Sequence, residues 1–164
     1  MSTHREGRRF SRDLPSRRGW VYHAFGADAL QTLTYKGVVY PWHCDQMGHM
    51  NVMWYTGKFD EATWNLLAEL GLGRSYMEER NCGMVAVQQN TSYKKELVAG
   101  DLIEIRSTVL EVREKVIRFQ HEMRNTQTGE VAALTELTGV HLDRKTRRSC
   151  PLPDNARAAA AARI

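Results

Sequence analysis

Several signatures of common protein classes are absent from this chain of 164 residues. Its three cysteines, Cys44, Cys82 and Cys150, form no CxxC pair, so the sequence suggests neither a disulfide framework nor a zinc cluster and favours a reducing cytoplasm. No apolar run approaches the roughly 20 residues of a membrane helix. The N-terminus lacks the apolar segment of a secretory signal. We therefore expect a cytoplasmic protein with no membrane segment.

Charge of one sign is scarce outside the N-terminus. Residues 1–18 hold six arginines and two acids, which accounts for the whole net charge of +4, and residues 19–164 are neutral. A nucleic-acid-binding domain would carry basic residues on its folded surface, so we expect no nucleic-acid partner. We interpret residues 1–19 as a flexible basic arm, and deleting residues 1–18 should leave activity nearly unchanged.

The clearest element in the sequence is a helix over residues 51–70. Asn51 stands where an N-cap belongs, and Gly71 and Gly73 supply the stop. We expect this aromatic-rich helix to be buried on most of its surface. Its apolar residues recur at spacings of three and four, which is the helical period; they are Val52, Tyr55, Phe59, Ala62, Leu66 and Leu70.

The rest of the domain has the pattern of a β-sheet. A short run over 35–42 stops at Pro41, and a short helix could form over 20–33. Long strands are expected over 84–97, 102–113, 115–125 and 130–142, with short connections that predict an antiparallel meander. One long helix on one sheet is a two-layer α+β arrangement. We expect a single domain over 20–153 and a short C-terminal helical tail over 154–164.

Reactive side chains are densest in residues 43–51, HCDQMGHMN, between the first strand and the helix. The N-terminus of a helix offers free amides that can hold an oxyanion. The carboxylate of Asp45, placed just before it, could act as a general base or a nucleophile in acyl transfer. Alternatively, Asp45 caps a turn and Gly48 merely bends the chain. The residues alone favour neither interpretation.

The segment VVYPWHCDQMGHMNVMWYTGKFDEAT (residues 38–63) resembles the signature of the hotdog-fold acyl-CoA thioesterases, the 4-hydroxybenzoyl-CoA thioesterase family with its YbgC-like members. The resemblance spans about residues 35–153 and implies a long helix wrapped by a five- to six-stranded antiparallel sheet. The matching positions in the segment are Asp45, Gly48, His49, Asn51, Tyr55, Glu61 and Ala62; downstream matches are Tyr93, Gly100, Asp101, Asp143 and 151–153.

The resemblance implies an acyl-CoA thioester hydrolase that needs no metal or cofactor. Asp45 would be the catalytic aspartate, acting on water or directly on the thioester. The backbone amide of Val52 would polarise the carbonyl. His49 would position the substrate, assist as an acid, or simply pack, and we place positioning first.

Three further residues have roles that we predict separately from that of Asp45. His43 stands where many family members have a second aspartate, and it either hydrogen-bonds Asp45 or is a solvated loop residue. Cys44 is expected to be a spectator. His121 shares a strand face with apolar residues, which is typical of a satisfied core histidine.

Substrate contacts are expected from two regions. The basic run 143–148, with Arg144 and Arg147, would meet the phosphates of CoA together with Lys94 or Lys95. The alternative is a solvated surface run. Methionine and aromatic side chains would line the acyl pocket, although core packing explains the same residues. The residues expected at the acyl group are Met47, Met50, Met53, Trp54 and Tyr55, with Asn51 beside them.

By analogy with the family, we expect a homodimer or homotetramer with its active sites at the dimer interface. An exposed sheet edge that needs cover supports this expectation. The alternative function is a non-catalytic hotdog domain that binds acyl-CoA or acyl carrier protein. A hotdog dehydratase has no matching motif here.

Overall fold

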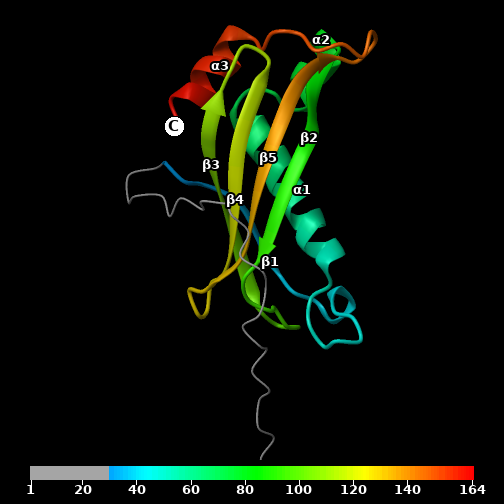
Figure 1. Ribbon diagram of the computed structural model, residues 1–164, viewed down its shortest axis with the longest axis vertical. Coiled ribbons are helices and arrows are strands. Elements are labelled where there is room, and N and C mark those ends of the chain that lie inside the picture. Colours follow the sequence, from blue (N-terminus) through cyan, green and yellow to red (C-terminus); the bar gives the residue numbers. More distant parts are fainter. Residues whose placement is uncertain (1–29) are drawn as a thin grey trace, which may run out of the picture.

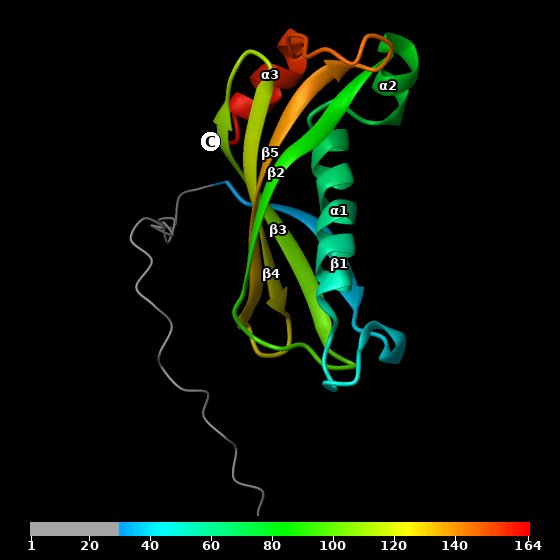
Figure 2. The ribbon, with the colours of Figure 1, turned by 45° about the vertical axis from the view of Figure 1, so that its right-hand side comes forward.

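The computed structural model describes residues 30–164, which fold as one antiparallel sheet against one long helix (Figure 1). This confirms the expected α+β architecture. Figure 2 shows α1 lying along one face of the curved sheet, with α2 and α3 at one end. The elements in chain order are β1 (Thr32–Val38), a 3-10 turn (Pro41–His43), α1 (Val52–Glu69), α2 (Arg74–Arg80), β2 (Cys82–Tyr93), β3 (Leu102–Val112), β4 (Val116–Asn125), β5 (Val131–Asp143) and α3 (Asp154–Ala161).

Helix α1 has the boundaries that its sequence predicts. Asn51 is the N-cap, and its side-chain oxygen accepts the Met53 amide at 3.0 Å. Gly71, at φ +79°, carries the chain out of the helix. Within a single chain, only the side of α1 that faces the sheet is buried. The expectation that most of the helix surface is buried is therefore wrong for the single chain. Thr56, Asp60 and Trp64 face away from the core and are exposed.

The strand order is β1-β3-β4-β5-β2, so the expected meander holds only for β3, β4 and β5. Strand β2 pairs with β5 instead of β3, because β1 already occupies that edge of β3. Gly100 therefore closes no hairpin. Its amide donates to the Val39 carbonyl at 2.8 Å, which ties the connection between β2 and β3 to the end of β1.

Both ends of the described chain differ from the sequence expectation in detail. Strand β1 already begins at Thr32, so the last residues of the possible 20–33 helix are strand, and the rest of that segment lies outside the described residues, as does the 1–19 arm. Helix α3 is short, but Ala156 and Ala160 are fully buried and share a core cluster with Leu66 and Leu70. Burial of this apolar face stabilises a helix that would be marginal alone.

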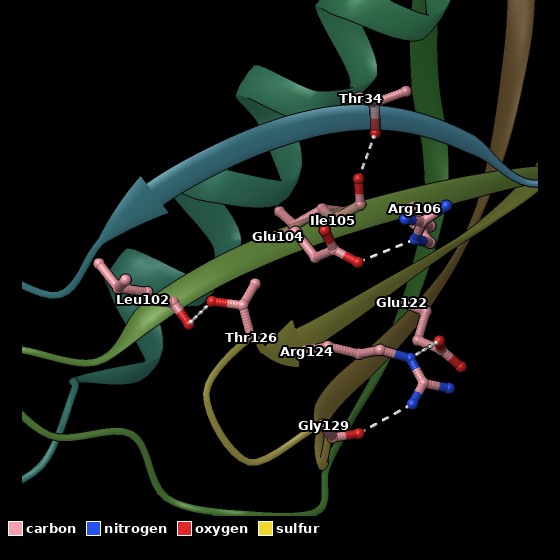
Figure 3. A network of polar contacts seen from close by, with 9 residues as sticks. All are labelled: Thr34, Leu102, Glu104, Ile105, Arg106, Glu122, Arg124, Thr126 and Gly129. Carbon is pink, nitrogen blue, oxygen red and sulfur yellow. Dashed lines mark hydrogen bonds and ion pairs between the residues drawn. The ribbon is translucent and has the colours of Figure 1, made fainter.

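Opposite charges cover the outer face of the sheet (Figure 3). Glu104 lies opposite Arg124, and Arg106 lies opposite Glu122, across strands β3 and β4. Within β3, the Arg106 Nε donates to the Glu104 carboxylate at 2.9 Å. Cross-strand pairs of opposite charge support the register. These charge pairs lie on the outer face of β3 and β4, and the alternate side chains Ile103, Ile105 and Met123 are buried on the inner side.

His121 of β4 is a fully buried core residue, as its strand face predicts. Its Nε2 lies 2.9 Å from the Thr63 hydroxyl, and its Nδ1 lies 2.6 Å from the Ser107 hydroxyl. The Ser107 hydroxyl in turn lies 2.7 Å from that of Thr34. The His121 ring stacks parallel to that of Phe59. Burial lowers the pKa of His121 to about 3, so the ring is neutral in the folded protein.

Candidate active site

The loop before α1 is a tight turn closed by paired backbone. Cys44 and Met50 form an isolated antiparallel bridge, and the amide of Gly48 donates to the Asp45 carbonyl at 3.0 Å. Gly48 has φ +83°, a conformation that favours glycine. The side chain of Met50 is buried, and its backbone amide donates a hydrogen bond to the Leu97 carbonyl. Both contacts hold the loop against the core.

The carboxylate of Asp45 is held by two donors. Its Oδ1 accepts the Met47 amide at 2.9 Å, and its Oδ2 accepts the Asn51 side-chain amide at 2.7 Å. These two hydrogen bonds lower the pKa of Asp45 below its usual value, and the bond from Asn51 has the larger effect. The group is therefore ionised at neutral pH, and it remains partly exposed. Such a carboxylate is oriented and able to accept a proton or attack a carbonyl.

Asn51 links this carboxylate to the helix N-terminus. Its nitrogen donates to Asp45 while its oxygen accepts the amide of Met53, so both polar atoms have partners within the chain. The next amide, that of Val52, has no hydrogen-bond acceptor within residues 30–164. The site thus places a fixed carboxylate beside an open amide donor at the positive end of an 18-residue helix.

The two histidines of the loop have different environments. His49 is partly buried, and its Nε2 lies 3.6 Å from the Glu96 carboxylate. His43 is buried; its Nδ1 accepts the Tyr40 amide at 3.0 Å, and its ring packs 4.3 Å from that of Trp54. Burial lowers the pKa of His43. Both predictions for His43 are therefore wrong, since it neither bonds Asp45 nor is solvated.

The residues expected at the acyl group separate into core and surface. Tyr55 is 3% exposed and donates to the Lys95 carbonyl at 3.3 Å, and burial raises its pKa to about 12. Met50 is likewise core. Trp54 is half-buried against His43. Met47 and Met53 are 77% and 62% exposed and form, with Val52, an apolar surface at the helix entrance.

An apolar groove, which the sequence did not reveal, runs between α1 and β2. Its volume is about 240 Å³. Asp60 is the single carboxylate among its lining residues, and Asp45 does not line it. A signal was present in the sequence: Thr56, Asp60 and Trp64 recur every four residues on the side of α1 away from its apolar stripe. The wall opposite α1 comes from Met84, Val85, Ala86, Gln89, Phe119, Leu137 and Gly139.

The segment between β5 and α3, which holds Arg144 and Arg147, lies beside α2, at the end of α1 away from the loop before α1 that holds Asp45 (Figure 2). The two arginines line a cavity of about 390 Å³ together with Arg74 of α2. The carboxylate of Asp143 orders their turn by accepting the amides that follow it, and these bonds lower its pKa. Within one chain the structure therefore does not bring Arg144 and Arg147 to the predicted catalytic aspartate.

Comparison with known proteins adds the family. The sequence profile of the thioesterase-like superfamily matches residues 39–160. The chain belongs to this superfamily. The match covers the site loop, α1 and all strands except β1, and it confirms the resemblance to hotdog-fold thioesterases. The enzyme class that follows is thioesterase.

Individual relatives agree with this assignment. A betainyl-CoA thioesterase of Pseudomonas aeruginosa is 25% identical over 118 residues, covering 72% of this chain and 74% of that protein. A gentisyl-coenzyme A thioesterase has a structure that matches at a TM-score of 0.68 and 26% identity, covering 77% of this chain and 98% of that chain. A Staphylococcus aureus protein solved in complex with CoA matches at 0.76 and 19%, covering 81% and 84%.

No helix in residues 30–164 is long and apolar enough to cross a membrane.

Proposed function

We propose that this thioesterase hydrolyses acyl-CoA, with Asp45 as the catalytic carboxylate and the Val52 amide as the oxyanion donor. The observation that carries the proposal is the bridge made by Asn51, which fixes the Asp45 carboxylate next to the open end of α1. CoA esters as substrates are supported by the names of the two related thioesterases and by the CoA-bound structural neighbour.

In the general-base form of this mechanism, Asp45 takes a proton from water as the water oxygen bonds to the thioester carbon. The carbonyl electrons move to oxygen, which the Val52 amide stabilises. Collapse breaks the carbon–sulfur bond, and the departing thiolate receives the proton from Asp45. In the nucleophilic form, Asp45 displaces the thiolate first and water then cleaves the mixed anhydride. The site geometry is compatible with both forms.

Two of the remaining loop residues have supporting roles in the proposal. Asn51 acts as a positioning residue, because its side-chain nitrogen donates to Asp45 and its oxygen accepts the amide of Met53. His49 lies beside Glu96 at the edge of the loop, where it orients the substrate without touching Asp45. The apolar surface of Met47 and Met53 and the groove beside α1 supply apolar contact for the acyl group.

A homodimer formed through β2 would unite the two separated halves of the site. One end of β2 lies next to Arg144, whose amide donates to the Asn81 carbonyl at 2.9 Å. Beyond the other end of β2, the Leu97 carbonyl accepts a hydrogen bond from the amide of Met50 in the loop that holds Asp45. Antiparallel pairing of two β2 edges would place the Arg144 end of one copy beside the Asp45 end of the other. The phosphates of CoA would then meet arginines of the second copy.

The catalytic assignment is tested by comparing Asp45→Asn with Asp154→Asn. Both changes remove one negative charge from an exposed or partly exposed carboxylate, and Asp154 lies at the start of α3, where its carboxylate pairs with Arg157. We expect Asp45→Asn to lose at least about a hundredfold in kcat, as removal of a general base does, while Asp154→Asn retains turnover. A panel of short, long, branched and aromatic acyl-CoA esters provides the assay. Near-wild-type turnover by a folded Asp45→Asn enzyme would eliminate the mechanism.

The assembly is tested at the two sheet edges. Val87 is 60% exposed on β2, and Leu33 is 39% exposed on β1. A lysine on an edge strand opposes pairing with another chain. We expect Val87→Lys to be monomeric in analytical ultracentrifugation and to lose activity, and Leu33→Lys to stay dimeric and active. A monomeric wild-type enzyme with full activity would contradict the shared site.

A further inference from the structure

Two of the three cysteines converge with a histidine at the end of the sheet remote from Asp45. Cys82 is the first residue of β2, His141 lies near the end of β5, and Cys150 follows in the segment that leads to α3. Leu142 of β5 pairs with Gly83 on one side and with Ser149 on the other. The two cysteines therefore flank β5 from opposite sides, with His141 on the strand between them.

Two of the three separations between donor atoms in this cluster are close to those of metal ligands. The two Sγ atoms are 4.0 Å apart, and the Cys150 Sγ lies 3.3 Å from the His141 Nδ1. All three donor atoms lie within 4.8 Å of one another. Tetrahedral zinc bonds of about 2.3 Å to sulfur and about 2.05 Å to nitrogen imply separations of about 3.8 Å between sulfurs and about 3.6 Å between sulfur and nitrogen. We propose that Cys82, His141 and Cys150 bind one zinc ion.

The surroundings of His141 suit this role. The ring is 1% exposed, and its Nε2 lies 2.9 Å from the hydroxyl of Tyr76 on α2. With Nδ1 on the metal, the Nε2–H donates to the Tyr76 oxygen, which is the outer partner that a ligating histidine commonly has. Without metal, Nδ1–H donates to the Cys150 carbonyl at 3.0 Å and Nε2 accepts from Tyr76. The Tyr76 hydroxyl serves both tautomers.

The cluster is also accessible. A cavity of about 590 Å³ opens onto Cys82, His141 and Cys150, so a water can take the fourth position. Zinc binding would displace the protons of both thiols, since the thiolate is the form that ligates a metal. The ion would join β2, β5 and the segment leading to α3.

The sulfur separation fits a bridging metal better than a direct disulfide. The Sγ atoms of Cys82 and Cys150 are 4.0 Å apart, whereas a disulfide bond is about 2.05 Å long. A zinc ion spans the present separation of the sulfurs without further approach.

The test uses the full-length, untagged chain, stripped with a chelator and then titrated with Co²⁺. We expect one Co²⁺ per chain, with thiolate-to-cobalt charge-transfer bands and the intense d–d bands of a tetrahedral site, and displacement by Zn²⁺. Cys82→Ser and Cys150→Ser should each weaken binding at least about tenfold, and Tyr76→Phe should weaken it by a smaller factor. Cys44→Ser is the matched control and should bind as wild type does.

Thermal denaturation gives a second readout. Zn²⁺ should raise the Tm of the wild-type protein and of Cys44→Ser, and it should leave the Tm of Cys82→Ser unchanged. Absence of stoichiometric Co²⁺ or Zn²⁺ binding by the reduced wild-type protein would overturn the proposal, as would binding that survives both serine variants. A third result would also overturn the proposal: the protein binds no metal, and mild oxidation removes the thiols of Cys82 and Cys150 but not that of Cys44. That result would identify Cys82 and Cys150 as a redox pair. None of these results depends on acyl-CoA turnover.

Discussion

The buried His121 makes the stability of the fold sensitive to mild acid. Its ring is neutral in the folded state because burial lowers its pKa from 6.5 to about 3. Both ring nitrogens lie within hydrogen-bond distance of hydroxyls, those of Thr63 and Ser107, and no carboxylate of residues 30–164 contacts the ring. The unfolded chain, in contrast, protonates this histidine below about pH 6.5. Acid therefore favours the unfolded state.

The size of the effect follows from linkage. The folded pKa of this base is depressed, so its stabilising contribution is complete above pH 6.5 and is lost as the pH falls toward 3. Within that window the free energy of unfolding falls by up to about 1.4 kcal/mol per pH unit. Between about pH 8 and pH 5, His121 alone should cost about 2 kcal/mol.

The assay is urea denaturation of the wild type and of His121→Gln across that pH range. The glutamine variant keeps a polar side chain but cannot titrate, and its lower overall stability does not matter because the pH dependence is compared. His43 acts in the same direction in both proteins, so it cancels in the difference. The wild type should lose about 2 kcal/mol more than the variant. Parallel pH profiles for the two proteins would refute the reasoning.

Two further predictions concern backbone and core. A methyl group added at Gly48 or at Gly57 meets no atom within 4 Å. Gly48→Ala should nevertheless destabilise the protein by about 1 kcal/mol and lower turnover, because Gly48 has φ +83°. Gly57→Ala should instead stabilise α1 by up to about 1 kcal/mol, as measured by chemical denaturation. Leu66→Ala, at a fully buried position, should cost about 2–5 kcal/mol, while Leu33→Ala, at a position that is 39% exposed, should cost less. Equal effects within either pair would contradict the packing described.

The parts of the fold that depend on local pattern were predictable. Helix α1 has a periodic apolar stripe and a capping asparagine, and both act within a few residues of one another. The pairing of β2 was not predictable in this way. Strand length and alternation are the same whether β2 lies beside β3 or β5, and the choice depends on β1, which takes the edge of β3. Competition between distant strands leaves no mark in the local pattern.

The candidate site shows the same division. Asp45, Asn51 and Val52 lie within eight residues of sequence, so one turn and one helix end bring them together, and the motif could be found. The groove beside α1 combines a helix with strands further along the chain. The cluster of Cys82, His141 and Cys150 is more extreme still. Scattered spacing argues against a metal site only when the ligands must come from one loop. Here β2, β5 and the segment after β5 supply them.

In the homodimer that we propose, catalysis and assembly are not independent. A single chain holds the carboxylate at one end of α1 and the arginine cluster at the other. Within residues 30–164, the exposed side of α1, the apolar groove and the edge of β2 all lie on the same flank. A two-fold axis through the middle of β2 would cover that flank and exchange the two ends in one operation. The exposed Trp64 and Val87 would then be contacts by which each chain completes the site of the other.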